Sequence, residues 1–250
     1  MAQSAKGAAV PLILQVRRTD KEKRGDPLRG REQWRLRPVR KADTPSSAMK
    51  TCWRWLVTDW NWPGAAAFCG AVLLLLVPVV FLTAGWAISL VLLQLPLYMF
   101  HQLEEHAGDR FRRQVNEVIG GGLEVLSRPA TFVINSLGVW GIDLLAIYLA
   151  VFVAPGWGLM AIYLPLVNAL GHIGEGLVLR RYNPGLWTAL LLFVPVSGTA
   201  LFLLSRGAAA SHLMQAAGFA VALLVHVAII AHVKFRKRAL IAPGPARPAH

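Results

Sequence analysis

Charged residues are scarce in this sequence and missing from one long stretch of it. Asp, Glu, Lys and Arg make up 16% of the 250 residues, against roughly 25% in soluble domains. Residues 61–100 contain none of them. These forty residues would rise about 60 Å as a helix, enough for two crossings of a hydrocarbon core about 30 Å thick. The composition excludes an ordinary soluble enzyme and a nucleic-acid module, and indicates a polytopic helical membrane protein.

Cysteine is also rare, and acidic residues are outnumbered. The two cysteines, Cys52 and Cys69, lie at the border of an apolar run and within it, so they provide no disulfide framework. Lys and Arg number 26 against 13 Asp and Glu. In a membrane protein this excess reports which loops stay in the cytoplasm rather than a nucleic-acid partner. The expected partner is the lipid bilayer.

The two ends of the chain are polar and basic. The first 48 residues carry 12 Lys and Arg against 5 acidic residues and few aromatic ones, so they bury too little apolar surface to fold alone. We expect a disordered basic tail over 1–58, a transmembrane domain over 59–235 and a basic C-terminal tail over 236–250. A start of translation at Met49 is an alternative that would remove most of the first tail.

The hydrophobic pattern predicts an all-α bundle of about six transmembrane helices. Short breaks with Gly or Pro separate the apolar runs, and prolines inside the runs are tolerated because neighbouring helices can satisfy the freed carbonyls. The connection 109–127 is too charged to cross and repeats its apolar residues near helical spacing, so we expect part of it to lie along the interface. The expected spans are 65–83, 86–106, 129–153, 157–179, 186–204 and 211–233.

The distribution of positive charge predicts the orientation of these spans. With the N-terminus in the cytoplasm, 25 of the 26 Lys and Arg residues fall on the cytoplasmic side, and only Arg206 falls outside. The positive-inside rule therefore favours six spans with both termini cytoplasmic. We expect a multi-pass protein of the cell membrane.

Ionisable residues within spans are costly and usually face a protein interior or a cavity. The second span ends in His101-Gln-Leu-Glu104-Glu105, which puts both glutamates on the face of His101 at i+3 and i+4. The fourth span carries His172 and Glu175 at the same i+3 spacing, with Asn168 one turn earlier. These two spans run in the same direction.

The depths of these residues agree with one another. His172 and His226 each lie eight residues before a basic residue, which is about 12 Å inside the cytoplasmic end. Asn135 lies in the same half of the third span, whereas Asp143 is nearer the bilayer middle. We therefore expect potential ligands from four spans to converge at one level.

Two kinds of chemistry suit this set. Imidazole and carboxylate are ligands of Zn²⁺ and Fe²⁺, which would make His101, Glu104, Glu105, His172 and Glu175 candidate metal ligands. Without a metal, adjacent carboxylates raise one pKa, so Glu104, Glu105 and Glu175 are also candidate acids or bases. Structural alternatives stay open: glutamates paired with arginines at the interface, a His–Glu hydrogen bond between helices, and a packing role for His226.

The sequence resembles the HxxEE-motif family of uncharacterised bacterial integral membrane proteins. His101-Gln-Leu-Glu104-Glu105 matches the naming motif, and Asn168-Ala-Leu-Gly-His172 resembles a second Asn/His element. Residues 181–189, Arg-Tyr-Asn-Pro-Gly-Leu-Trp-Thr-Ala, are similar to a Tyr-x-Pro-Gly-x-x-Thr-Ala segment. The resemblance covers about 65–235. It implies a membrane protein with a site at these motifs, and no substrate.

The leading hypothesis is a membrane enzyme that acts on a lipid-like molecule at the cytoplasmic side, with these His and Glu residues as metal ligands or as acid–base groups and Asn168 orienting one of them. A small transporter or a proton or ion pathway is the alternative, because it would use the same His and Glu residues. A glutamate-type intramembrane protease is less favoured. Its Glu-Glu-x-x-x-Arg pattern fails here, since Arg110 lies one residue too far from the Glu104–Glu105 pair.

Overall fold

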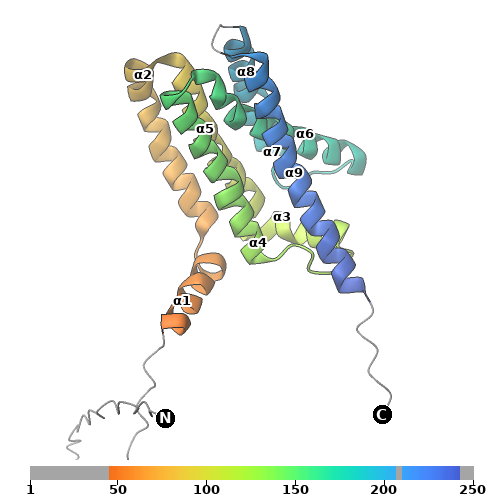
Figure 1. Ribbon diagram of the computed structural model, residues 1–250. Coiled ribbons are helices and arrows are strands. Elements are labelled where there is room, and N and C mark those ends of the chain that lie inside the picture. The colour runs from red at the N-terminus through yellow and green to blue at the C-terminus, as the bar shows by residue number, and fades with distance from the viewer. Residues whose placement is uncertain (1–44, 207–209, 243–250) are drawn as a thin grey trace, which may run out of the picture. The chain divides into compact units, whose positions relative to one another are not determined.

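The computed structural model describes residues 45–206 and 210–242. In that part of the chain every regular element is a helix, as the hydrophobic pattern predicts. Five helical segments among the described residues are long and apolar enough to cross a membrane. They pack as a bundle with short helices at one end (Figure 1). The fold is therefore the expected polytopic helical bundle of the membrane-spanning type.

The first of the five segments contains two of the six expected spans. Helix α2 (Trp62–His106) is interrupted at Gly85, whose φ of 83° and ψ of 174° are not helical. The two halves return alongside each other, because a Cβ placed on Gly70 would lie 3.2 Å from the Cβ of Met99. The rings of Trp62 and His106 are 5.0 Å apart, so both ends of α2 meet. Only glycine adopts this positive φ without strain.

The other four spans lie close to their expected bounds. Most of these spans consist of two or three helical segments that follow one another directly and run in the same direction. The third span joins α4 (Arg128–Val133), a π-helical stretch (Ile134–Trp140) and α5 (Gly141–Phe152). The fourth joins a short turn (Pro155–Gly158) and α6 (Leu159–Leu179). The fifth joins α7 (Leu186–Thr188), a π-helical stretch (Ala189–Ser197) and α8 (Gly198–Arg206), and the sixth is α9 (His212–Ile241).

The helical part of the chain extends further at both ends than the sequence predicted. Most of the predicted disordered tail, 1–44, lies outside the described residues, as do 243–250. Residues expected within the tails are helical: α1 (Pro45–Arg54) and the π-helical turn after it (Trp55–Asp59), and the end of α9. For the turn after α1, the reason is packing of apolar side chains that a charge count does not register. Val57 is buried and contributes to a cluster with Trp62 and Phe132.

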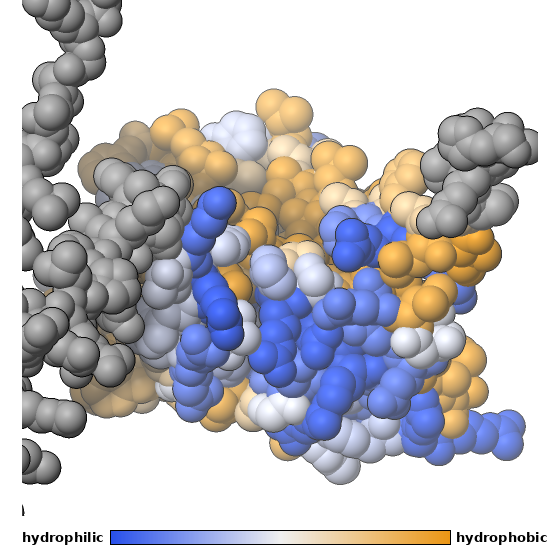
Figure 2. Space-filling model, turned by 90° about the horizontal axis from the view of Figure 1, so that it is seen from below, coloured by the Kyte–Doolittle hydropathy of each residue, from blue (hydrophilic) through white to orange (hydrophobic). Residues whose placement is uncertain are grey.

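The connection between the second and third spans forms the expected short helix. It consists of α3 (Arg110–Gln114) and a π-helical stretch (Val115–Ile119), and it ends where Gly121 and Gly122 adopt positive φ. Lys237 Nζ donates to the carbonyl of Ile119 at 2.6 Å, which ties this connection to α9. Figure 2 shows hydrophilic side chains gathered at this end of the bundle, beside hydrophobic ones.

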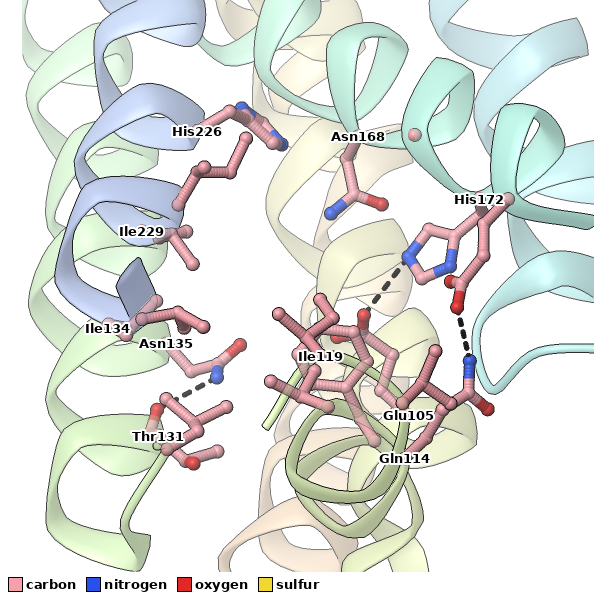
Figure 3. A pocket seen from close by; sticks show the side chains of 18 of the residues that line it. Glu105, Gln114, Ile119, Thr131, Ile134, Asn135, Asn168, His172, His226 and Ile229 are labelled. Atoms are coloured by element: carbon pink, nitrogen blue, oxygen red, sulfur yellow. Dashed lines mark hydrogen bonds and ion pairs between the residues drawn. The ribbon is translucent and has the colours of Figure 1, made fainter. Parts of the chain in front are cut away.

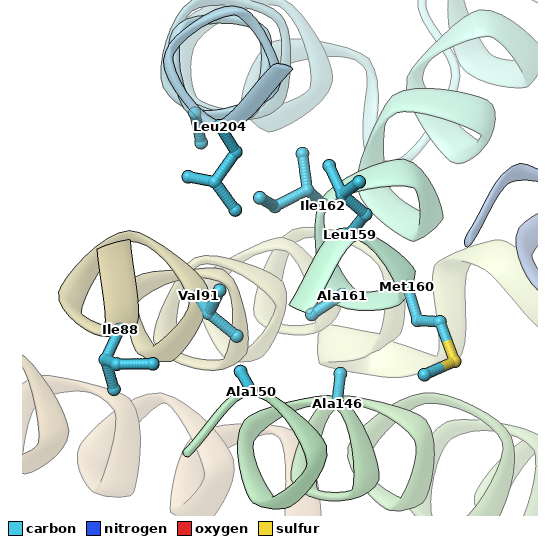
Figure 4. Close-up of a cluster of buried hydrophobic side chains, with 10 residues drawn as sticks. Ile88, Val91, Ala146, Ala150, Leu159, Met160, Ala161, Ile162 and Leu204 are labelled. Atoms are coloured by element: carbon cyan, nitrogen blue, oxygen red, sulfur yellow. The ribbon is translucent and has the colours of Figure 1, made fainter. Parts of the chain in front are cut away.

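The main core lies between α2, α5, α6 and α8. Small residues, Ala146 and Ala150 on α5 and Ala161 on α6, have almost no exposed surface and allow the helices to approach closely. Val91 and Leu204 fill the space between them (Figure 4). This rigid centre fixes the spacing between α2 and α6, the two helices that carry the His and Glu motifs.

The outer surface of the spans is apolar. Leu75, Leu82, Phe152, Leu177 and Val178 each expose more than 70% of their surface. Soluble monomers rarely carry contiguous apolar patches of this kind. Such a surface is suited to the hydrocarbon of a bilayer.

A buried hydrogen-bonded group joins α2 to the third span and yields a stability prediction. Trp140 Nε1 donates to Gln102 Oε1 at 2.7 Å, and Gln102 Nε2 donates to Asn135 Oδ1 at 3.0 Å. Gln102→Leu would leave both partners unpaired, so we expect the free energy of unfolding in detergent to fall by about 1–3 kcal/mol. Combining it with Trp140→Phe should cost less than the sum of the two. Unfolding curves unchanged by Gln102→Leu would contradict this.

Candidate functional site

The two sequence motifs meet in one buried group. His101 and Glu105 lie one turn apart near the end of α2, and His172 lies on the facing part of α6. The three side chains are buried, and one ligand atom from each lies within 4.8 Å of the other two. Among the described residues, this is the group of His and acidic side chains with the spacing to hold a metal ion.

Glu105 is at the centre of this group. Its Oε1 lies 3.0 Å from Nε2 of His172 and 3.4 Å from Nε2 of His101. Its other oxygen, Oε2, lies 3.2 Å from Nε2 of His106. Three imidazole nitrogens therefore face one carboxylate that is only 4% exposed.

The outer nitrogen of His172 is held by an amide. Nδ1 of His172 lies 2.8 Å from Oδ1 of Asn183, while Nδ2 of Asn183 donates to the backbone carbonyl of His172 at 2.8 Å. The second bond fixes the orientation of the amide, so that its oxygen faces the imidazole. Because an amide oxygen only accepts, Nδ1 of His172 carries the proton. In the neutral ring, Nε2 then presents a lone pair to Glu105.

The outer nitrogen of His101 is held by a hydroxyl. Nδ1 of His101 lies 2.7 Å from Oγ1 of Thr188, and that hydroxyl donates to Glu104 Oε2 at 2.6 Å. Since the hydroxyl proton is used in this bond, Thr188 accepts the proton on Nδ1 of His101. The Nε2 atom of His101 therefore also presents a lone pair toward Glu105, and it has no hydrogen-bond partner in the part of the chain that the structure describes.

The geometry leaves three electron-pair donors facing one another without a proton between them. This arrangement is unfavourable unless a proton or a cation lies among them. Metal-bound histidines almost always donate their other ring N–H to a carboxylate, carbonyl or similar oxygen, which orients the ring. His101 and His172 both meet that description. Two imidazoles and one carboxylate suit Zn²⁺ or Fe²⁺, with a position left for water or substrate.

Gly185 packs closely against both imidazole rings. A Cβ at this position would lie 2.6 Å from Cε1 of His172 and 2.8 Å from Cε1 of His101. The residue also has a φ of +104°, which favours glycine. The segment from Asn183 to Thr188 thus contacts both histidines through an amide, a backbone and a hydroxyl.

Glu104 points away from the group, toward this same segment. Its two oxygens accept from Tyr182 OH at 2.9 Å, from the backbone N–H groups of Trp187 and Thr188 at 3.1 and 2.7 Å, and from the Thr188 hydroxyl. The two amides belong to the first turn of α7, where a carboxylate is stabilised by the helix dipole. Burial and the contact with Glu104 raise the pKa of the Tyr182 phenol, which keeps it a donor.

A cavity of about 630 Å³ lies beside the His and Glu group (Figure 3). It is enclosed by the end of α2, the connection containing α3, the start of the third span, and the adjoining halves of α6 and α9. Glu105 and His172 line it, whereas His101 lies behind them with no exposed surface. A ligand held at the group would therefore have its open side toward this cavity.

The other residues singled out in the sequence have separate positions. Asn135, Asn168 and His226 line the cavity, as the depth comparison predicts. Glu175 also lines it, but it accepts from Gln114 Nε2 at 2.7 Å and lies outside the group of three. Asp143 is fully buried on α5, and neither of its oxygens has a hydrogen-bond partner among the described residues.

Sequence reasoning missed the residues that orient the histidines. Asn183, Gly185 and Thr188 stand in the sequence only within the segment 181–189 that carries the family resemblance. That segment was the available signal, because it holds a polar amide, a glycine and a hydroxyl close together. His106, which the sequence does not single out, is 7% exposed and faces Glu105.

Fold and site together define a membrane-type helical bundle that encloses a buried His/Glu group. Residues 92–200 match the family described as "Protein of unknown function with HXXEE motif". The match confirms the resemblance drawn from the sequence, and it includes all three motifs. Comparison with curated proteins and with solved structures found no match.

The orienting hydroxyl of Thr188 can be tested without touching a ligand. Thr188→Val keeps the shape of the side chain but leaves Nδ1 of His101 unpaired, so the ring loses its fixed tautomer. We expect the affinity for Zn²⁺ to fall about 10- to 100-fold, as for other outer partners of metal-bound histidines. Thr188→Ser retains the hydroxyl and should bind as the parent does. Equal affinities for Thr188→Val and the parent would contradict this role.

Proposed function

We propose that this protein is a metal-dependent membrane enzyme whose metal is held by His101, Glu105 and His172. One observation carries the proposal: the outer partners of both histidines direct the lone pairs of Nε2 at the carboxylate of Glu105. A purely structural ion pair would need a second proton on one of these rings, because the contacts to Asn183 and Thr188 already use the proton on Nδ1. A metal ion needs only the neutral rings that these contacts orient.

The number of ligands favours catalysis over a structural role. Structural zinc sites usually have four protein ligands, whereas catalytic sites keep three and leave a position open. Here the open side faces a cavity. Zn²⁺ at this position would supply an activated water for hydrolysis, and Fe²⁺ with two histidines and one carboxylate is typical of oxidation chemistry. The identity of the bound element therefore distinguishes the two reaction classes.

A lipid-like substrate fits the surroundings of the site. The cavity lies beside α6 and α9, and Val, Leu and Ile make up 12 of its 26 lining residues. A water-soluble substrate would gain little from such a wall. The basic residues on α3 and at the end of α9 support a cytoplasmic position for this end of the bundle under the positive-inside rule.

Turnover can be tested before the substrate is known. The purified protein, reconstituted in bilayers of extracted bacterial lipids, is loaded with Zn²⁺ or Fe²⁺, and the lipids are compared by mass spectrometry before and after incubation. We expect at least one lipid species to decline with the loaded parent protein and to persist with the metal-free protein and with Glu105→Gln. Tight metal binding with no lipid altered by the loaded protein would overturn the enzyme proposal while leaving the metal site in place.

A further inference from the structure

We propose that the cavity beside the His/Glu group binds an amphiphile with a single hydrocarbon chain and a hydrogen-bond-donating head. The molecule enters from the bilayer between α6 and α9, with its head toward Glu105 and its chain toward the lipid. This inference rests on the proposed function, because it names the substrate class of the same site. Three features of the cavity support it: the polarity of its lining, the opening at its rim and its volume.

The cavity combines buried polar groups with exposed apolar ones. Its inner, buried part is lined by the polar side chains of Glu105, His172 and Asn135, which are at most 7% exposed, and by the buried Oδ1 of Asn168. Figure 3 shows Asn168 and His172 on one side of the space, with His226 and Ile229 facing them from α9. A molecule that fills the whole cavity therefore needs a polar group at the inner end and apolar surface elsewhere.

The exposed rim of the cavity is formed by apolar side chains and one lysine. Val178 on α6 is 81% exposed and Ile230 on α9 is 54% exposed, and both line the cavity. Both belong to segments apolar enough to cross a membrane. Ile119, on the charged connection, is 49% exposed, and the exposed Lys234 of α9 lines the cavity as well. The opening therefore suits the border between hydrocarbon and head groups, where a chain can enter from the bilayer.

The volume limits the occupant to one chain. At roughly 30 Å³ for each water-sized group, a cavity of about 630 Å³ holds roughly 20 methylene-sized groups. That is the size of one long hydrocarbon chain with a small head. A glycerophospholipid with two such chains needs about twice this space. Two-chain lipids are therefore excluded from complete burial here.

One inner side chain indicates the nature of the head. Oδ1 of Asn168 is buried and has no hydrogen-bond partner among the described residues. An amide oxygen accepts, and leaving it unpaired is costly. A head with an O–H group, such as that of a long-chain alcohol, would supply the missing donor. Figure 3 shows this oxygen on the side of the amide that faces His172.

The test is photolabelling of the purified full-length protein in nanodiscs. The probe is a long-chain alcohol with a diazirine near the end of its chain, and labelled peptides are identified by mass spectrometry. We expect label on the peptides that contain Val178 and Ile230. The methyl ether of the same probe lacks the donor and should label these peptides roughly 3- to 10-fold less. In Asn168→Leu the two probes should label equally.

A plug at the rim provides the matched control. Ile230→Trp fills the opening and should lower labelling of the Val178 peptide at least about 10-fold. Leu224→Trp adds the same side chain to an exposed position of α9 that does not line the cavity, and should leave labelling unchanged. A diazirine phospholipid with two chains should label both variants and the parent alike.

The outcomes separate this inference from the proposed function. Zn²⁺ content is measured on the same samples. Retained metal with labelling that Ile230→Trp does not change would overturn the inference and leave the metal site standing. Labelling blocked by Ile230→Trp in a protein that binds no metal would support the amphiphile site and overturn the proposed function. Equal labelling by the alcohol and its ether in the parent protein would overturn the assigned head.

Discussion

Glu105→Gln is expected to abolish metal binding while the bundle stays folded. The substitution keeps the size of the side chain but removes the charge that faces three imidazole nitrogens at 3.0 to 3.4 Å. Changes to outer partners alone lower metal affinity about 10- to 100-fold, so loss of a ligand should lower it by more than about 100-fold. Zn²⁺ affinity, measured by competition with a chelating dye, checks this expectation.

Glu104→Gln is the matched control for this variant. Adjacent residues of a helix point about 100° apart, and Glu104 accordingly meets Tyr182, Trp187 and Thr188 rather than the histidines. Its variant loses charge-assisted hydrogen bonds at the start of α7, so it should reduce thermal stability more than Glu105→Gln does. It acts on the metal only through Thr188, with a loss of about 10- to 100-fold at most. Equal losses of affinity in the two variants would contradict the roles assigned here.

Gly185→Ala is expected to disrupt the site through a single methyl group. The added Cβ would lie 2.6 Å from one histidine ring and 2.8 Å from the other, so both imidazoles must move. The positive φ adds about 1–2 kcal/mol of backbone strain for any residue with a Cβ. We expect Zn²⁺ affinity to fall more than about 10-fold, since ligand positions must hold to within about 0.5 Å.

Gly122→Ala is the control for Gly185→Ala, because it adds backbone strain without a new contact to the histidines. Gly122 has a φ of +88°, but a Cβ there would meet nothing within 4 Å. Gly122→Ala should therefore lower the free energy of unfolding by about as much as the strain in Gly185→Ala does, and it should leave the Zn²⁺ affinity unchanged. If both alanine variants bind Zn²⁺ as the parent does, the close contact between Gly185 and the imidazoles is not part of the site.

The spans could be predicted from the sequence because each is a long apolar run that a charged segment ends on one side and a short break ends on the other. Even the hairpin in α2 was indicated, since Ala84 and Gly85 interrupt two runs that each suffice for one crossing. The helical turns before Trp60 could not be found this way. Their stability comes from packing against residues far along the chain, such as Phe132, which a local pattern does not contain.

The proximity of three candidate residues could be predicted. Spacing placed His101 and Glu105 on one face and depth brought His172 to the same level, and in the structure one ligand atom of each lies within 4.8 Å of the other two. The same arguments could not separate Glu104 from Glu105, because both are near His101 along the helix. What separates them is the loop that contains Asn183 and Thr188, which binds one carboxylate and leaves the other to the histidines. Contacts between distant segments of this kind leave little trace in a single sequence.

The metal content of the purified protein tests the central claim most directly. The full chain is purified in detergent without chelators, beside a His101→Ala/His172→Ala variant, and both are analysed by inductively coupled plasma mass spectrometry. The account predicts close to one zinc or iron per chain in the parent protein and none in the variant. A parent protein that carries no metal and takes up neither ion when it is supplied would contradict the account.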